Sequence, residues 1–404
     1  MSQHLLELLD LSFRWVHVIA GIMWIGNSLL FNWLDRNLRP SSRGAPEVYG
    51  DIWLLHSGAF YFVEKTSLSG QPMPRPLHWF KWQAYTTWLS GAALLIALYY
   101  VGARELLTDP ATSSLSQLAA VGVGVGAIVV AQIVYDALWK MVGPRSMAAA
   151  GALSIAALVM LAYGLTSLLS GRAAYLHMGA VLATIMAANV AHVIMPSQRK
   201  LVAAVTAGEP PDPAVAWAAK TRSIHNNYLT FPVIVLMLSN HFPSVYGNRY
   251  SWQLMLVLIA IGAAVRHILN VRFTFPRWRP ALTLTLAAGF AVLFIAGRTS
   301  ARMDAVANGV DGASVPADVS FEQVRSIIDR RCAACHSQAP SIPDFGAPPA
   351  GVSFDDPARI RALVARIQVR AVETRTMPLG NRTHMTERER AILARWIERQ
   401  GGKD

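Results

Sequence analysis

The two cysteines of this 404-residue chain, Cys332 and Cys335, stand three positions apart, and His336 follows the second one directly. C-x-x-C-H is the attachment pattern of a c-type haem. The spacing suits the chemistry, because two thiols must each form a thioether with a porphyrin vinyl group while the adjacent histidine reaches the iron. We therefore predict a covalently bound haem c with His336 as an axial ligand.

Two other chemistries use paired cysteines. A structural zinc site would need further Cys or His ligands nearby, and the tail offers only His384. A thioredoxin-like dithiol would need a βαβ context, and the surrounding sequence does not indicate one. The haem interpretation is therefore favoured.

The residues around the motif predict a small class I cytochrome c domain over 318–404. The stretches "SFEQVRSIIDRR" and "TERERAILARWIERQ" have the periodicity of amphipathic helices and are typical of the two crossing terminal helices of such a domain. Met377, in "TRTMPLG", lies in the usual place for the sixth iron ligand, and Met/His ligation raises the reduction potential of a haem. The alternative for Met377 is a packing role in the domain core.

The rest of the chain has the composition of a membrane protein. Apolar residues make up 53% and charged residues only 15%, whereas about a quarter of the residues are charged in soluble proteins. The apolar runs end near residue 297, and 298–317, rich in Ala, Gly, Ser and Asp, predicts a linker. We therefore expect a membrane domain over 1–297. The net charge of +12 does not indicate nucleic-acid binding, because the basic residues lie in short loops between apolar runs.

Eight apolar runs are long enough to cross a bilayer, which takes about 20 residues. They must be helices, since every backbone amide in lipid needs a partner within its own segment. The fold class predicted is therefore all-α, an eight-helix transmembrane bundle followed by the cytochrome c domain. The segment 52–63 is apolar but short, and we interpret it as a re-entrant or interfacial helix. The spans lie near 11–34, 82–101, 115–138, 147–170, 173–195, 224–241, 252–271 and 281–297.

Loop charges predict the orientation. The loops after the first, third, fifth and seventh spans carry fifteen Lys and Arg residues, and the loops after the second, fourth and sixth carry three. The positive-inside rule places the basic loops in the cytoplasm and both termini outside. The cytochrome c domain would then lie on the periplasmic side of a bacterial inner membrane, in the compartment where haem c is attached.

Ionisable side chains at membrane depth are costly and usually functional, although each one can also be a hydrogen-bonded packing residue. In the first span, Arg14, His17 and Ser28 follow one helical face together with Gly21 and Trp24. By the predicted topology His17, His177 and His241 lie toward the outer surface. The inner half would hold His56, His192, His225, Arg266 and His267. The repeat "VGVGVG" (Gly122, Gly124, Gly126) lies inside a span and predicts close helix packing.

Several longer motifs extend over the whole chain: "FRWVHVIAGIMWIGNSLLFNWLDRNL", "GDIWLLHSGAFYFVEK", "VAHVIMPSQRK", "KTRSIHNNYLTFPV" and the terminal CAACH with its TMP. In this combination the chain resembles the membrane-bound, cytochrome-c-linked bacterial urate oxidases, also called urate hydroxylases. CAACH alone is not specific, whereas its combination with an eight-span domain is.

The resemblance implies that urate is oxidised to 5-hydroxyisourate and that electrons pass through haem c to the respiratory chain, with a soluble cytochrome c or a terminal oxidase as acceptor. No hydrogen peroxide would form. Urate is an electron-rich anion that suits Arg or His partners, so we predict His17, His177 and Arg266 as catalytic residues.

Distance raises a further question, because a pocket at the cytoplasmic face would lie on the order of 30 Å from an outer haem. Either urate binds in the outer half, or a second redox centre bridges the gap. Paired histidines on facing helices can ligate a haem b or another metal centre, and His192, His225 and His267 are the candidates. The competing functions are a dehydrogenase for another donor such as a quinol, a membrane-anchored electron-transfer cytochrome, and a transporter, in which the haem would have no role.

Overall fold

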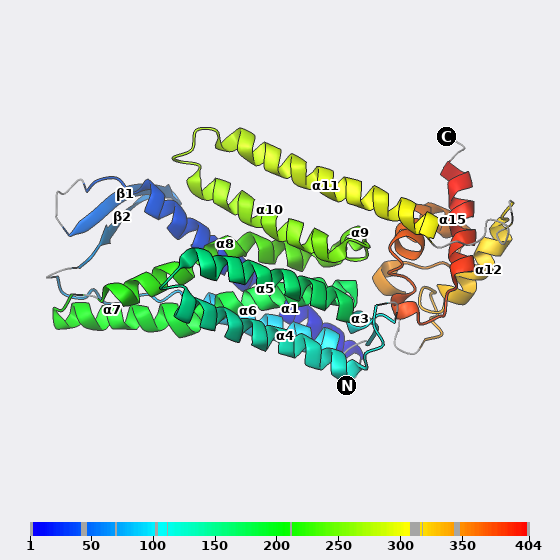
Figure 1. Cartoon of the computed structure of the whole chain (residues 1–404), viewed down its shortest axis with the longest axis horizontal. Coiled ribbons are helices and arrows are strands. Elements are labelled where there is room, and N and C mark those ends of the chain that lie inside the picture. Colours follow the sequence, from blue (N-terminus) through cyan, green and yellow to red (C-terminus); the bar gives the residue numbers. More distant parts are fainter. Residues whose placement is uncertain are drawn as a thin grey trace.

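The computed structural model describes residues 3–41, 47–68, 71–101, 104–110, 112–210, 212–307, 316, 318–342 and 348–401. The fold is mostly helical, as predicted, with long helices that run up and down beside one another (Figure 1). The helices of residues 1–307 are α1 (Gln3–Asn37), α2 (Trp82–Leu95) continued by the π-helix η1 (Ile96–Tyr100), α3 (Arg104–Leu107), α4 (Gln117–Ala137) continued by the π-helix η2 (Leu138–Val142), α5 (Met147–Leu168), α6 (Gly171–Ala188) continued by the π-helix η3 (Asn189–Ile194) and then α7 (Met195–Ala207), α8 (Pro213–Leu238), the 3₁₀ turn η4 (Ser239–His241), α9 (Pro243–Tyr246), α10 (Ser251–Val271) and α11 (Trp278–Ala307).

Six helical segments in the described residues are long and apolar enough to cross a membrane. They are Leu8–Asn37, Gln117–Val142, Met147–Leu168, Gly171–Ala207, Ser251–Val271 and Trp278–Gly297. The other two predicted spans, 82–101 and 224–241, also form helices, but α2–η1 and α8 are less apolar because polar and aromatic residues occupy much of their length. Membrane crossing by these two helices stays a prediction.

The segment 52–63 is not a helix, so this prediction was wrong. Residues 48–66 form an antiparallel hairpin of β1 (Val48–His56) and β2 (Ala59–Thr66), in which Trp53 pairs with Phe62. The two turn residues, Ser57 and Gly58, have positive φ angles of 53° and 75°, which match the twist of a tight hairpin. Aromatic and β-branched residues on both sides of a Ser-Gly turn favour this pairing over a short helix.

Buried helix α6 is the centre of the bundle and packs against α4, α5 and α8. The serines before α4, α5 and α6 (Ser116, Ser146 and Ser170) each accept a hydrogen bond from a first-turn amide, so all three helices begin at an N-cap. By contrast, large apolar side chains of α1 and α11, such as Trp15 and Phe290, are exposed, as expected for surfaces that face lipid.

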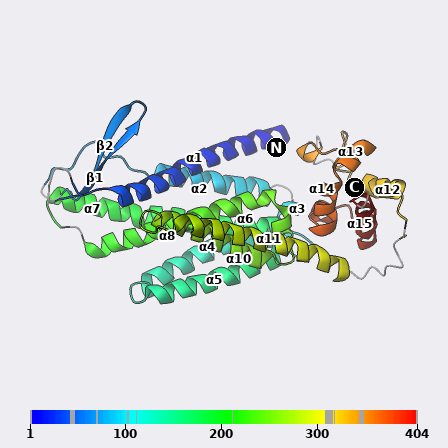
Figure 2. The same ribbon diagram turned by 90° about the horizontal axis from the view of Figure 1, so that it is seen from above.

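The bundle has two distinct ends. The hairpin and α7 lie at one end, which we call the hairpin end, and the N-terminus and the C-terminal residues 318–401 lie at the other, which we call the module end (Figures 1 and 2). Helix α11 continues to Ala307, ten residues into the predicted linker. Of the remaining linker positions, 308–315 and 317 lie outside the described residues.

Residues 318–401, the C-terminal module, form a small helical unit with its own apolar core. Val324 and Ile328 of the first helix meet Leu393 and Trp396 of the last one in this core. The elements are α12 (Phe321–Arg331), η6 (Pro349–Gly351), α13 (Pro357–Ala362), α14 (Val364–Ile367), the π-helix η7 (Gln368–Glu373), η8 (Leu379–Asn381) and α15 (Glu387–Gly401). The structure thus packs the two predicted amphipathic terminal helices together.

Candidate functional site

The cysteine motif forms a tight turn directly after α12. The backbone amides of Cys335 and His336 both donate to the carbonyl of Cys332, at 3.1 and 2.9 Å. The Nδ1 atom of His336 lies 2.9 Å from the carbonyl oxygen of Val352. Since a carbonyl only accepts, Nδ1 must carry the proton, and Nε2 is left as the ligand atom. This is the usual arrangement of a metal-ligating histidine, so the motif fits a haem c.

The protonation of the motif also favours haem attachment over the two other uses of paired cysteines. Burial raises the pKa of the Cys332 thiol to about 12, whereas a reactive dithiol needs a thiol pKa that is lowered. Burial lowers the pKa of His336, opposed by its hydrogen bond to the Val352 carbonyl, and a lowered pKa favours the neutral ring that a metal ligand needs. Among the described residues, no three His, Cys, Asp or Glu side chains are grouped so that they could hold a metal ion.

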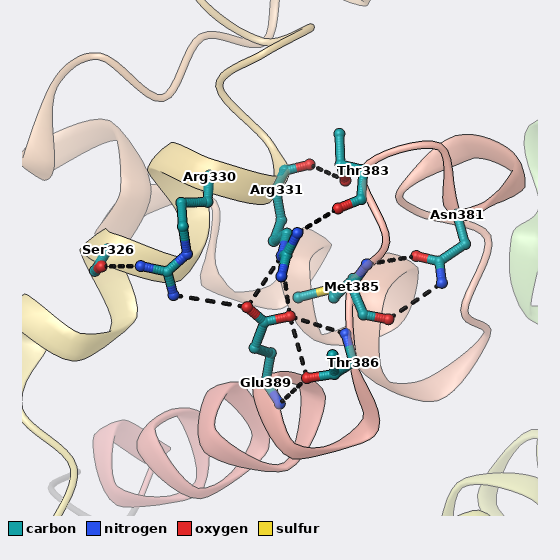
Figure 3. A network of polar contacts seen from close by, with 8 residues as sticks. All are labelled: Ser326, Arg330, Arg331, Asn381, Thr383, Met385, Thr386 and Glu389. Atoms are coloured by element: carbon teal, nitrogen blue, oxygen red, sulfur yellow. Dashed lines mark hydrogen bonds and ion pairs between the residues drawn. The ribbon is translucent and has the colours of Figure 1, made fainter.

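A polar network holds the motif to α15 (Figure 3). The Nε atom of Arg331, the residue before Cys332, donates to the Glu389 carboxylate at 3.0 Å, and Arg331 Nη1 donates to the Thr383 carbonyl at 2.5 Å. The Thr383 hydroxyl in turn donates to the Arg331 carbonyl at 2.8 Å. Glu389 also accepts from the backbone amide of Thr386 at 2.8 Å, so it caps α15 as well.

Met377 lies in the segment between η7 and η8. Its amide donates to the Arg370 carbonyl at 2.9 Å, and its carbonyl accepts from the buried guanidinium of Arg390 at 2.9 Å. Arg390 also donates to the Ala371 carbonyl. The backbone of the predicted sixth ligand is therefore fixed from two sides, while the iron bond itself stays a prediction.

The Met377 segment is also the surface on which the module meets the bundle. Arg370 Nη1 donates to the Tyr246 hydroxyl of α9 at 3.2 Å. A Cβ atom at Gly247 would lie 2.8 Å from Cβ of Thr374 and 2.9 Å from Cγ2 of Thr376. Only glycine allows the backbone to approach this closely. The segment that carries Met377 is thus held against the module end of the bundle. Figures 1 and 2 show the module beside this end.

Two of the predicted catalytic residues, His17 and His177, have different hydrogen-bond partners and lie on different helices of the bundle. His17 is half-buried on α1, and its Nδ1 lies 2.9 Å from the carbonyl of Thr87 on α2. His177 is fully buried on α6, with Nδ1 2.8 Å from the Ala173 carbonyl and Nε2 3.0 Å from the Tyr100 hydroxyl. Both ring nitrogens of His177 are therefore engaged, and the described contacts do not join His17 to His177.

A polar cluster lies where α8 meets α4 and η3. The Tyr135 hydroxyl is 2.7 Å from Nδ1 of His225 and accepts from Asn189 Nδ2 at 3.0 Å, while Asn189 also donates to Asn226 Oδ1 at 2.9 Å. Arg222, on the same face of α8, donates to Asp136 at 3.0 Å and stays buried, with no hydrogen-bond partner for its Nη1 atom. The cluster adjoins two π-helical turns, η2 and η3, a distortion that is frequent at functional sites.

The third predicted catalytic residue, Arg266, lies on the opposite side of α8 and is 1% exposed. Its Nε donates to Asn227 Oδ1 at 3.1 Å and to the Asn227 carbonyl at 3.2 Å. Asn270, one turn along α10, donates to the same Asn227 Oδ1 at 2.7 Å. Beside them the Tyr228 hydroxyl lies 2.7 Å from Nδ1 of His267.

The three histidines of the predicted second redox centre have different surroundings, and the centre itself stays a prediction. His225 faces Tyr135 and Trp139 of the α4–η2 segment, whereas His267 faces Tyr228 between α8 and α10, and His192 is exposed on η3. The described residues therefore bring no two of the three histidines together on facing helices. His56 and His241 are exposed too, His56 at the hairpin turn and His241 in η4.

Several members of these clusters were missed in the sequence. Asn189, Asn227 and Asn270 are neutral, so they do not stand out in a search for ionisable groups. The signal that could have found two of the α8 residues is "HNNY", a polar run inside an otherwise apolar segment.

A comparison with known proteins complements this geometry. A protein-family model with the description "Urate oxidase N-terminal" matches residues 3–297. No curated protein and no solved structure matches the chain. The matched region ends where the apolar runs end and leaves out the C-terminal module.

Proposed function

Because the chain belongs to the family described as urate oxidase N-terminal, we propose that it oxidises urate to 5-hydroxyisourate and delivers the electrons to a haem c on its own C-terminal module. Urate and one water give 5-hydroxyisourate, two protons and two electrons, so oxygen is not consumed and no hydrogen peroxide forms. The observation that carries the proposal is the docking of a C-x-x-C-H module, through the segment that holds Met377, on the matched helical region.

Four residues of the module would hold the cofactor. Cys332 and Cys335 would form the thioethers, and His336 and Met377 would be the axial ligands. When bound, a haem c accepts one electron at a time, so a two-electron oxidation needs two successive transfers. The Val352 carbonyl keeps the His336 ring in its ligand tautomer, and the Arg331–Glu389 pair fixes the turn that carries the cysteines.

The proposal includes a location in the bacterial inner membrane with the module end in the periplasm. The excess of basic residues in the loops after the first, third, fifth and seventh predicted spans supports it through the positive-inside rule. A soluble cytochrome c or a terminal oxidase, the acceptors implied by the resemblance, could then reach the module from the periplasm.

Anaerobic mixing of urate with the purified full-length protein tests the proposal. We expect the reduced haem α-band to appear, with one haem c per chain by pyridine haemochrome and no peroxide in an aerobic assay. The Cys332→Ala and Cys335→Ala double variant should still bind urate but show no α-band. A band that stays oxidised with urate, yet is reduced by a quinol, would contradict the proposal and favour a quinol dehydrogenase.

A further inference from the structure

We propose that Arg266 and Asn270 form the binding site for the urate anion, in the half of the bundle nearer the hairpin end. This proposal rests on the proposed function and names the groups that recognise its substrate. Its basis is a pair of buried polar side chains that the protein itself leaves incompletely satisfied.

Arg266 is a buried cation without a counterion. Its Nη2 atom is buried and has no hydrogen-bond partner, and none of the described carboxylates pairs with it. Another buried arginine, Arg222, is paired with Asp136 on the other face of α8. A buried charge is strongly destabilising unless it is paired, so the free side of Arg266 calls for an anion.

Asn270 needs a hydrogen-bond donor, whereas Arg266 needs an acceptor. Its Oδ1 atom is also buried without a partner, while its Nδ2 donates to Asn227. Arg266 and Asn270 are four residues apart on α10, so they share a helix face, and both bond to the same oxygen of Asn227. The residues that carry this unpartnered donor and this unpartnered acceptor are thus both tied to one oxygen of Asn227.

A donor and an acceptor that both lack a partner favour a particular class of ligand. Chloride would neutralise Arg266 but could not donate to Asn270, and a neutral amide would leave the charge unpaired. Urate is an anion at neutral pH whose ring edge alternates carbonyl oxygens with N–H groups. It can accept from Arg266 Nη2 and donate to Asn270 Oδ1 with neighbouring atoms.

The surrounding helices keep this site in place. The backbone of α8 lies so close to α10 that a Cβ atom at Gly262 would be 2.8 Å from the nitrogen of Pro232. The Cζ atom of Arg266 lies 5.5 Å from the centre of the Phe231 ring, and Arg266 Nε is held by both oxygens of Asn227. These contacts are sufficient for a purely structural role of Arg266. Such a role would leave the Nη2 atom without a function.

Equilibrium binding of urate to the purified full-length protein, measured by calorimetry, tests the site. We expect Arg266→Gln to raise the Kd for urate at least tenfold and Arg266→Lys to raise it less. Arg277→Gln, the same charge change at an exposed position of the α10–α11 loop, should leave the Kd unchanged. Chloride should not compete with urate.

Asn270→Asp gives the sharpest result. The new carboxylate would pair with Arg266, so we expect the variant to melt at a higher temperature than the unmodified protein and yet to lose urate binding at least tenfold. A structural role for Asn270 predicts no loss of binding when stability rises.

An unchanged Kd in both Arg266→Gln and Asn270→Asp would overturn the site, as would competition by chloride as effective as that by urate itself. The failure of the proposed function looks different. In that case urate binds with the expected dependence on Arg266, but the haem band stays oxidised.

Discussion

Of the three glycines in the repeat of α4, only Gly124 is close to another side chain. A Cβ atom there would lie 2.4 Å from Nε2 of His177 and 2.9 Å from the Tyr100 hydroxyl, whereas Gly122 and Gly126 have nothing within 4 Å. The close approach lets the Tyr100–His177 hydrogen bond form at the contact of α4 with α6. The glycine repeat is thus required at a single position.

We predict that Gly124→Ala destabilises the protein by about 1–3 kcal/mol, because overpacking must displace buried His177. Gly126→Ala on the same helix is the matched control, and it should be neutral or stabilising by up to about 1 kcal/mol through helix propensity. Thermal unfolding in detergent measures both. Equal effects of the two changes would contradict the steric account.

Because of Glu389, we predict that the C-terminal module loses stability in acid. Burial acts to raise its pKa, but the amide of Thr386 and the guanidinium of Arg331 outweigh burial, so the folded pKa lies below the ordinary value of 4.5. A lowered folded pKa adds stability above the unfolded pKa, and this stability is lost as the pH falls through the folded value.

We therefore expect the melting temperature of the module to fall as the pH drops below about 4.5. Glu389→Gln should melt lower at pH 7 and show a flatter decline in acid. Glu398→Gln, also on α15, is the control. Parallel pH profiles for Glu389→Gln and the unmodified protein would argue against this role for the Arg331–Glu389 pair.

Partners of single residues were the least predictable part of the site. The sequence indicated Arg266 and the histidines, because an ionisable group stands out in an apolar run. It did not indicate Asn227, which lies 39 positions from Arg266 and bonds to it only because α8 and α10 pack together. Neither the periodicity nor the composition of the sequence can predict such a hydrogen bond between two helices.

Elements were more predictable than contacts, because long apolar runs have few alternatives to a helix in lipid. The first and last helices of the module were also visible as amphipathic stretches. The hairpin at 48–66 was missed, since its apolar residues were interpreted by hydropathy while the Ser57–Gly58 turn was overlooked.

The contact of α9 with the Met377 segment, also a feature of single elements, can be tested by adding a larger side chain at Gly247. Gly247→Val would place a side chain against Thr374 and Thr376 and push the module away from the bundle. We expect urate to reduce the haem at least tenfold more slowly, while dithionite reduces it as fast as before. Cross-linking between α9 and the module should fall in parallel.

Gly297→Val, at a glycine of α11 with nothing within 4 Å, is the control for that variant. Arg370→Ala, which removes the hydrogen bond to Tyr246 without added bulk, should have a smaller effect in the same direction. Unchanged reduction by urate in both Gly247→Val and Arg370→Ala would show that docking at α9 does not matter for electron delivery.

At the scale of the whole molecule, the proposed substrate site lies far from the proposed electron acceptor. Along α10, Arg266 lies fifteen residues from Ser251 at the module end, which is about 22 Å of helix. In the proposed orientation, with the module end in the periplasm, negative charge would travel toward the periplasm in each cycle, either as two electrons or as one urate anion.

Such displacement couples the reaction to the transmembrane voltage. Each elementary charge that crosses the full layer gains about 2.3 kcal/mol per 100 mV when the interior is negative. In proteoliposomes with the module outside, a potassium diffusion potential of that sign should accelerate urate-dependent reduction of an external acceptor. The current per turnover would then distinguish mobile electrons, with two charges, from a mobile substrate, with one.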